Sequence, residues 1–273
     1  MYKILFLLLA SFCSAQSYRF VYEYKMKPDR KIDSLVTDYM NLDSDGKKSY
    51  FYNAAKYERD SAYNVTKNNA TMYNGKKYDQ NLGYLVEKNY AQKNIKFYDK
   101  YKTANLLVIE DEAPKWNIEK EFLAINNINC QKATANYKGR VWEVWFSKEY
   151  PINDGPYKFV GLPGLIVSLK DSEGNHTFNL IQIKKIKSVL AFLPKNSKEM
   201  SWKDYRKTLM TYTPNLADDI EAMSVDKNAG AMNLQFKDGY VAKFDLKELK
   251  RNGNPDDEIA KRLRRTNNPI EKE

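Results

Sequence analysis

The stretch GPYKFVGLPGLIV, residues 155–167, decides the fold, because it places three glycines and two prolines among thirteen residues just before an apolar run. The whole chain contains only 11 glycines and 9 prolines. Pro156 and Pro163 each fix a φ angle and remove a backbone donor, whereas Gly161 and Gly164 permit positive φ or a close backbone approach. The stretch therefore predicts a rigid corner at which the chain turns into a strand.

The corner also predicts which side chains are buried. Leu162 lies inside the bend, and Leu165, Val167 and Leu169 follow at the period of two that places them on one inward strand face. A phosphate-binding loop is the alternative reading, but such loops present free N–H groups at the start of a helix, and here a proline and a strand pattern follow. The predicted structural motif comprises Gly155, Pro156, Gly161, Leu162, Pro163, Gly164, Leu165 and Ile166.

Short segments with strand character continue on both sides of the corner. In residues 18–26, Phe20, Tyr22 and Tyr24 share one face, and the Asp-Gly step of residues 43–47 favours a tight hairpin turn. The other predicted strands come mostly in pairs across polar or glycine-containing breaks. The predicted strands are residues 18–26, 35–42, 49–52, 84–90, 94–101, 104–111, 130–137, 140–146, 165–170, 177–184, 231–236 and 240–246.

Helical patterns are few. We expect a surface helix over residues 54–65, an amphipathic helix over 202–210, and a charged helical tail over 256–265, where acidic residues precede basic ones as the helix macrodipole favours. There is no regular alternation of strand and helix and no repeat of fixed period. The fold class is therefore mainly β: a bent antiparallel sheet of meanders and hairpins, a half-barrel in its most curved form, covered by a few helices.

The N-terminus has the pattern of a secretory signal peptide. Residues 1–15 contain one lysine, an apolar run from Ile4 to Ala10 and a small-residue end, so we expect cleavage after Ala15 and a single domain over residues 16–273. A buried N-terminal element is the alternative, but no polar residues alternate along the run. Phe12 before Cys13 does not fit a lipoprotein signal. The sequence thus predicts export to the periplasm, outer envelope or extracellular space.

Charge and cysteine content narrow the environment further. The formal net charge of +10 becomes +9 without Lys3, which suits anionic envelope components or an ordinary basic surface. The charges are interspersed, which disfavours nucleic-acid binding. Without the signal peptide, Cys130 is the single cysteine, so no internal disulfide can form and we expect its thiol to be buried.

The motif and its surroundings resemble the GLPGLI proteins, exported proteins of Bacteroidetes-type bacteria named after the sequence at residues 161–166. The resemblance implies export but no activity, because the family has no established reaction and no agreed catalytic residues. It extends over nearly the whole predicted mature chain. The further matching segments are the N-terminal YRFVYEY strand, residues 130–133, 139–142, 145–146, 151–156 and the Asn-Pro-Ile-Glu ending at 268–271.

Candidate catalytic residues are sparse. His176 is the only histidine and follows a turn, which predicts a solvated side chain, although a Cys130–His176 pair on neighbouring strands is an alternative. One histidine and one mature cysteine do not suffice for a conventional zinc site, and no loop has the EF-hand pattern. We therefore expect no metal and no cofactor.

Two carboxylates near the motif are the best catalytic alternative. Glu143 and Asp154, with Glu149 and Asp171 close in sequence, offer an acid and a base for a hydrolase. In a strand, Glu143 shares a face with Trp145, opposite Trp142, and could line a groove for a sugar or peptide.

The function we predict from the sequence is non-enzymatic binding in the cell envelope. Arg140, Trp142 and Trp145 are candidate binding residues, and 21 tyrosines supply side chains that combine apolar area with a polar tip. The partner would be an envelope protein or a small ligand. An envelope hydrolase using Glu143 and Asp154 is the alternative.

Overall fold

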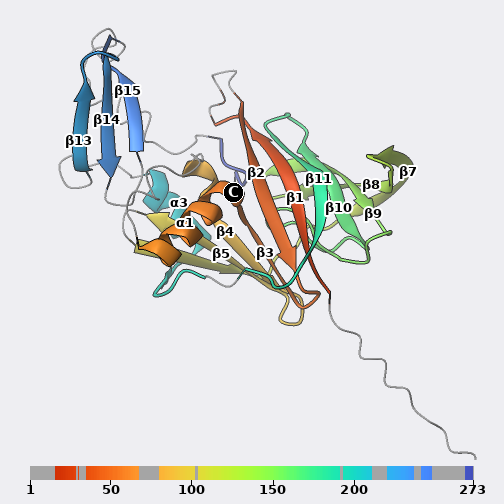
Figure 1. Cartoon of the computed structure of the whole chain (residues 1–273). Helices are drawn as coiled ribbons and strands as arrows, with labels where there is room; N and C mark the ends of the chain where they lie inside the picture. The colour runs from red at the N-terminus through yellow and green to blue at the C-terminus, as the bar shows by residue number, and fades with distance from the viewer. Residues whose placement is uncertain are drawn as a thin grey trace, which may run out of the picture.

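The computed structural model describes residues 16–28, 30, 35–67, 80–101, 104–190, 193–210, 220–236, 241–247 and 268–272. The predicted signal peptide and the predicted helix over residues 256–265 lie outside this part of the chain. Within it, twelve strands form one large sheet and three strands form a second sheet. The mainly β fold class is thereby confirmed (Figure 1).

The large sheet is strongly bent, and its two edge strands do not pair with each other. Its order is β12-β6-β5-β4-β3-β2-β1-β11-β10-β9-β8-β7, and every neighbouring pair is antiparallel except β12 with β6. The strands are β1 (Ser17–Met26), β2 (Val36–Ser44), β3 (Lys48–Asn53), β4 (Leu85–Asn89), β5 (Asn94–Tyr101), β6 (Ala104–Glu110), β7 (Asn117–Ile125), β8 (Ile128–Tyr137), β9 (Arg140–Ser147), β10 (Leu165–Asp171), β11 (His176–Ile186) and β12 (Lys198–Glu199).

The strands and turns predicted in this sheet are confirmed. Lys138 and Gly139 both have positive φ, 50° and 72°, as a two-residue hairpin turn of the primed type requires, and Gly46 has a φ of 80° in the β2–β3 turn. Three strands were not predicted: β7, the two-residue β12 and β13 of the second sheet. Almost every residue of β7 is exposed, so no alternation of apolar and polar residues marks it.

The predicted corner is confirmed at both glycines. Gly161 has a φ of 95° and Gly164 a φ of 155°, and a Cβ at Gly164 would lie 2.1 Å from the Ser147 carbonyl oxygen. Leu162 is buried as expected, and the following strand is buried on both faces near its start. Because β10 must approach β9 this closely, glycine is required at residue 164.

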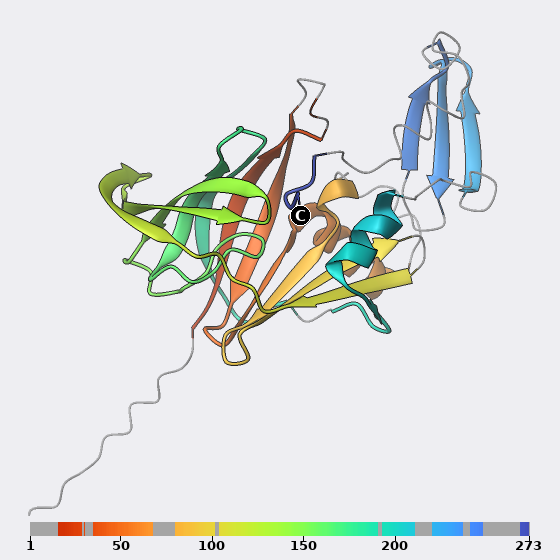
Figure 2. The ribbon, with the colours of Figure 1, turned by 180° about the vertical axis from the view of Figure 1, so that it is seen from behind.

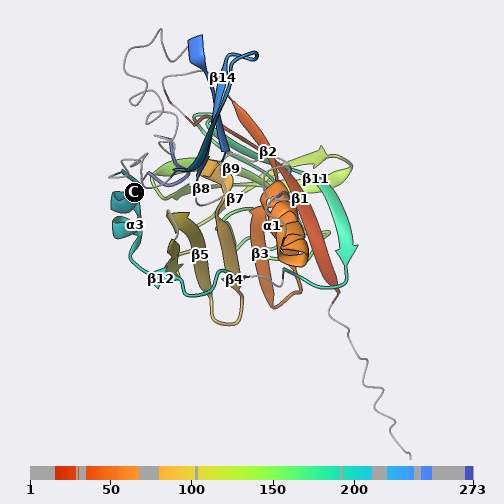
Figure 3. The same cartoon turned by 60° about the vertical axis from the view of Figure 1, so that its left-hand side comes forward.

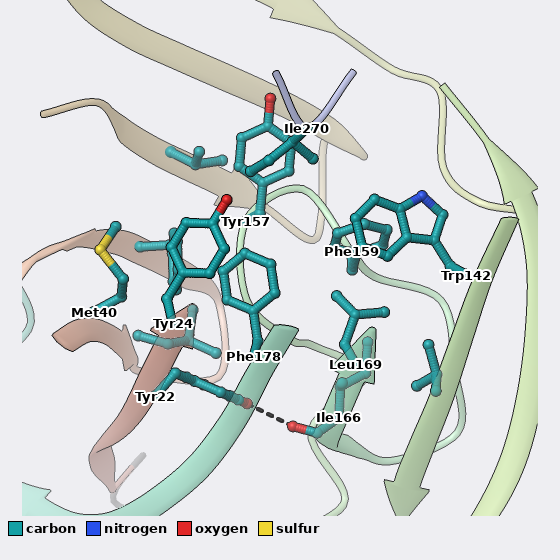
Figure 4. Close-up of a cluster of buried hydrophobic side chains, with 14 of the residues drawn as sticks. Tyr22, Tyr24, Met40, Trp142, Tyr157, Phe159, Ile166, Leu169, Phe178 and Ile270 are labelled. Atoms are coloured by element: carbon teal, nitrogen blue, oxygen red, sulfur yellow. Dashed lines mark hydrogen bonds between the residues drawn. The ribbon is translucent and has the colours of Figure 1, made fainter. Parts of the chain in front are cut away.

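The segment that forms the corner fills the concave side of the sheet. Figure 4 shows Tyr157 and Phe159 packed between the strands, with Trp142 on one side and Tyr24 on the other. The Tyr22 hydroxyl donates to the Ile166 carbonyl at 2.6 Å, which links β1 directly to β10. The interior of the bend is therefore a packed core.

Two helices pack on opposite faces of the large sheet, α1 (Ala54–Thr66) over β2 and β3 and α3 (Trp202–Met210) over β5 and β6. The α1 helix covers the outer face of β3, where Tyr57 packs on Tyr52, and α3 packs on Phe97 in the main core (Figure 3). A short 3-10 helix, η1 (Gln80–Leu82), precedes β4. The second sheet contains β13 (Ile220–Asp226), β14 (Ala231–Phe236) and β15 (Val241–Asp245).

The C-terminal residues 268–272 return to the concave side of the large sheet (Figure 2). Asn268, Ile270 and Glu271 are buried there. The Asn-Pro-Ile-Glu ending noted in the sequence is thus part of the core.

Candidate functional site

Strand β9 holds the residues predicted to bind a ligand, and the structure separates them. Trp142 is fully buried, packs on Phe159 with 4.7 Å between ring centroids, and donates its indole N–H to the Tyr137 carbonyl. Trp145 is half-buried on the other face, where Lys132 Nζ lies 5.9 Å from its ring. Trp142, a predicted binding residue, therefore lies on the core face of its strand and has no exposed surface.

Arg140, another predicted binding residue, contacts buried groups of the protein itself. Its guanidinium is buried, lies 2.7 Å from Asp171, and donates to Asn268 Oδ1 at 2.6 Å. It also donates to the carbonyl oxygens of Pro269 at 2.7 Å and Ile270 at 2.9 Å. Arg140 therefore anchors the C-terminal segment. This role depends on contacts between residues far apart in sequence, which the sequence alone does not show.

His176, predicted to be solvated, is buried. Its Nδ1 shares a hydrogen bond of 2.9 Å with the Tyr24 hydroxyl, and burial lowers the pKa of His176 to about 3. It pairs with Met26 at the start of β11, so the strand has already entered the sheet at this position. The turn residues before it are the solvated ones.

Cys130 is buried as predicted, and burial raises the pKa of its thiol to about 11. It lies on β8, and two strands, β9 and β10, separate it from the β11 strand that holds His176. The register places Cys130 near the opposite end of the sheet, because His176 is level with Trp142 and Ala135. The structure does not form a Cys130–His176 pair.

Asp154, one of the two candidate catalytic acids, is buried and saturated with partners. Its Oδ1 lies 2.5 Å from Lys88 Nζ and accepts from the Gly155 N–H, and its Oδ2 accepts from the Tyr90 hydroxyl at 2.5 Å. Lys88 also donates to the Gly155 carbonyl at 2.6 Å. Asp154 thus ties the corner segment to β4.

Glu143, the other candidate acid, lies on the opposite face of the sheet from the core that holds Asp154. It is half-buried beside Trp145, as predicted, and lies 3.0 Å from Lys170 and 3.7 Å from Lys132. Partial burial raises the pKa of Glu143, but the hydrogen bond and charge of Lys170 outweigh it, so the pKa lies below its usual range. The two carboxylates therefore do not form one site.

A buried ion pair that the sequence analysis did not identify lies in the main core. Lys158 is fully buried, with its Nζ 2.7 Å from Glu271 Oε1 and a second, short contact to Glu110. The ammonium lies 4.0 Å from the centroid of the Trp202 ring and 4.9 Å from that of Phe97. The only signal in the sequence is a lysine between aromatic residues inside the corner segment.

A pocket between α1, the β3–β5 strands and residues 193–194 offers about 280 Å³. Part of its lining is an apolar cluster beside α1, namely Tyr52, Tyr57, Leu85, Leu190 and Leu193. The polar part of the lining comprises Asn53, Lys56, Asp60, Ser61, Asn64, Asp99, Lys100 and Asn105. The sequence analysis did not single out these residues, because they come from three separate regions of the chain.

The charges within the pocket are largely balanced. Lys56 Nζ lies 2.7 Å from Asp60, and the rings of Tyr52 and Tyr57 are 5.0 Å apart at 55°. Asn53 begins α1 by accepting a hydrogen bond from the Lys56 N–H, which holds the first turn over the pocket. Aromatic surface beside amide, hydroxyl and paired ionic groups suits a small polar molecule with one apolar face.

The described part of the chain contains neither a metal-ligand cluster nor a membrane-spanning helix. There, no three His, Cys, Asp or Glu side chains gather in a way that could hold a metal ion. No helix among the described residues has the length and apolar character needed to cross a membrane.

Comparison with known proteins finds a family model that matches the middle of the chain. The model of a family described as a protein of unknown function (Porph_ging) matches residues 41–168, from β2 into β10. No curated protein has a matching sequence. The match supports the predicted uncharacterised family, and the narrower GLPGLI name stays a prediction.

Solved structures resemble the chain in fold. Two crystal forms of PNGF-II align with TM-scores of 0.54 and 0.53 at 14% and 13% sequence identity. Each alignment covers 81% of this chain and 40% of the PNGF-II chain, so the chain spans less than half of that protein. At these identities the likeness shows the fold alone.

Proposed function

We propose that the chain is an exported, non-enzymatic binding protein of the cell envelope, and that the pocket beside α1 holds a small polar ligand. One observation carries the proposal: the pocket combines a tyrosine and leucine surface with polar groups in about 280 Å³. Ligand sites commonly have this composition. The export of the protein is supported by the N-terminal residue pattern.

The hydrolase alternative has less support from the geometry. A pair of acid and base carboxylates must face one substrate, whereas Asp154 is enclosed by Lys88 and Tyr90 and Glu143 lies on the other face of the sheet. Both side chains have ion-pair partners that account for them structurally.

Native mass spectrometry of the mature protein, purified gently from the envelope of its own host, tests the proposal. Ser61 lines the pocket, whereas Val65 on the same helix is 83% exposed and lies outside the pocket lining. We expect a retained small molecule on the wild type and on Val65→Trp, and its loss from Ser61→Trp, in which the indole fills the pocket. A bare polypeptide in the wild type, or equal retention by Ser61→Trp, would contradict the proposed site.

A further inference from the structure

Strand β7 forms one edge of the large sheet, and of the strands that the structure describes it pairs with β8 alone. Its exposed apolar side chains are unusually concentrated: Ile118 is 45%, Leu123 51% and Phe122 70% exposed. Figures 1 and 2 show β7 at the margin of the molecule, with no described element on its outer side. An edge strand with exposed apolar residues is one on which another strand can pair.

The centre of β7 carries charges of both signs. Ile118 pairs with Ala133 and Phe122 with Gln131, so Glu119, Lys120 and Glu121 lie opposite the single residue Lys132. On the β8 side, Gln131 Nε2 donates to the Glu119 carbonyl at 2.7 Å, and Lys132 lies 2.9 Å from Glu121. Lys120 is exposed. A second strand at this edge would therefore meet one positive and two negative side chains.

The sequence of β7 complements itself in one antiparallel register. If Lys120 lies opposite Glu121 of a second copy, then Ile118 lies opposite Leu123 and Glu119 lies opposite Phe122. A two-fold axis produces each of these pairs twice. Opposite charges and apolar residues directly across two strands each stabilise the pairing. The neighbouring register, with Glu119 opposite Glu121, would instead place like charges together.

We propose that β7 is a homodimerisation edge, at which two copies of this chain pair antiparallel with Lys120 opposite Glu121 and continue the sheet across a two-fold axis. The opposite edge offers little for such pairing, because β12 has only two residues. The apolar residues of β7 are covered in the dimer, and the central charges select the register.

Sedimentation equilibrium of the mature protein tests the proposal with charge-swapped variants. In Lys120→Glu the new glutamate faces Glu121 of the other copy, and in Glu121→Lys the new lysine faces Lys120. Each variant alone should dimerise at least about tenfold more weakly than the wild type, since two attractive pairs become repulsive. An equimolar mixture should recover dimerisation, because each copy then complements the other. Lys203→Glu, at an exposed residue of α3, is the matched control and should dimerise like the wild type.

Three outcomes would overturn the proposal. A wild type that stays monomeric up to several hundred micromolar would exclude the homodimer. That outcome includes the case in which β7 pairs with an extended peptide of another protein instead of a second copy. A dimer that both single variants leave intact would place the interface elsewhere. Failure of the mixture to recover dimerisation, with both variants folded by circular dichroism, would exclude the register.

Discussion

Lys158 and Glu271 form an ion pair inside the main core, with 2.7 Å between Nζ and Oε1 and no exposed surface on either side chain. The pair joins the corner segment to the C-terminal segment. The Tyr157 hydroxyl donates to the same Glu271 oxygen at 2.5 Å, so two neighbouring residues of the corner hold the chain end.

Loss of one partner of this pair should destabilise the protein strongly. We expect Lys158→Met to lower the free energy of unfolding by about 3–5 kcal/mol, because Glu271 keeps a buried charge without its cation. Lys170→Met is the control: its pair with Glu143 is half-exposed and should contribute less than about 1 kcal/mol. Urea denaturation measures both. Similar losses for the two variants would contradict the assignment.

Acid should destabilise the protein partly through His176. Its pKa falls from 6.5 to about 3 on folding because the ring is buried, so as the pH falls the unfolded chain takes up the proton first. The contribution is complete above pH 6.5 and is lost progressively down to about pH 3, on the order of 5 kcal/mol in total.

The variant His176→Gln, which does not titrate, isolates this effect. The free energy of unfolding of the wild type should fall more steeply between pH 6.5 and 3 than that of the variant. Parallel pH profiles would show that His176 does not have the lowered pKa.

Substitution of the corner glycines should follow their local space. Gly164→Ala should destabilise most, because its Cβ would lie 2.1 Å from the Ser147 carbonyl oxygen. A Cβ at Gly161 would contact only Trp116 at 3.8 Å, and a Cβ at Gly174, the comparison residue in the β10–β11 turn, would contact nothing within 4 Å. Gly161→Ala and Gly174→Ala should therefore each lower the free energy of unfolding by about 1 kcal/mol, because of the positive φ alone. Gly164→Val should exceed Gly164→Ala. Thermal melting ranks the variants, and equal melting temperatures would refute the account of the corner.

The two candidate carboxylates, Asp154 and Glu143, should contribute unequally to the stability of the fold. Asp154→Asn leaves the Lys88 ammonium buried without its anion, and we expect a loss of about 3–5 kcal/mol. Glu143→Gln weakens a half-exposed pair and should cost less than about 1 kcal/mol. A folded Asp154→Asn protein with unchanged stability would contradict the structural role and would favour Asp154 as a catalytic acid.

Local patterns predicted most of the large sheet correctly. The alternation of β1, the Lys138-Gly139 turn and the corner glycines each depend on a few consecutive residues, so the sequence shows them directly. Strand β7 was missed because it is exposed almost throughout and carries no alternation. The burial of His176 was missed because the turn before it, and not the histidine itself, is the solvated part.

Most of the elements, the corner and most inward-facing residues can be read from the sequence, since steric limits on φ and the period of a strand act over short distances. The roles of the buried charged residues depend instead on the folded structure. Arg140 pairs with Asp171 and Lys158 pairs with Glu271, in each case across residues far apart in sequence, and their burial becomes favourable because each finds a partner of opposite charge. The pocket beside α1 has the same origin, because its walls come from segments that pairing in the sheet brings together.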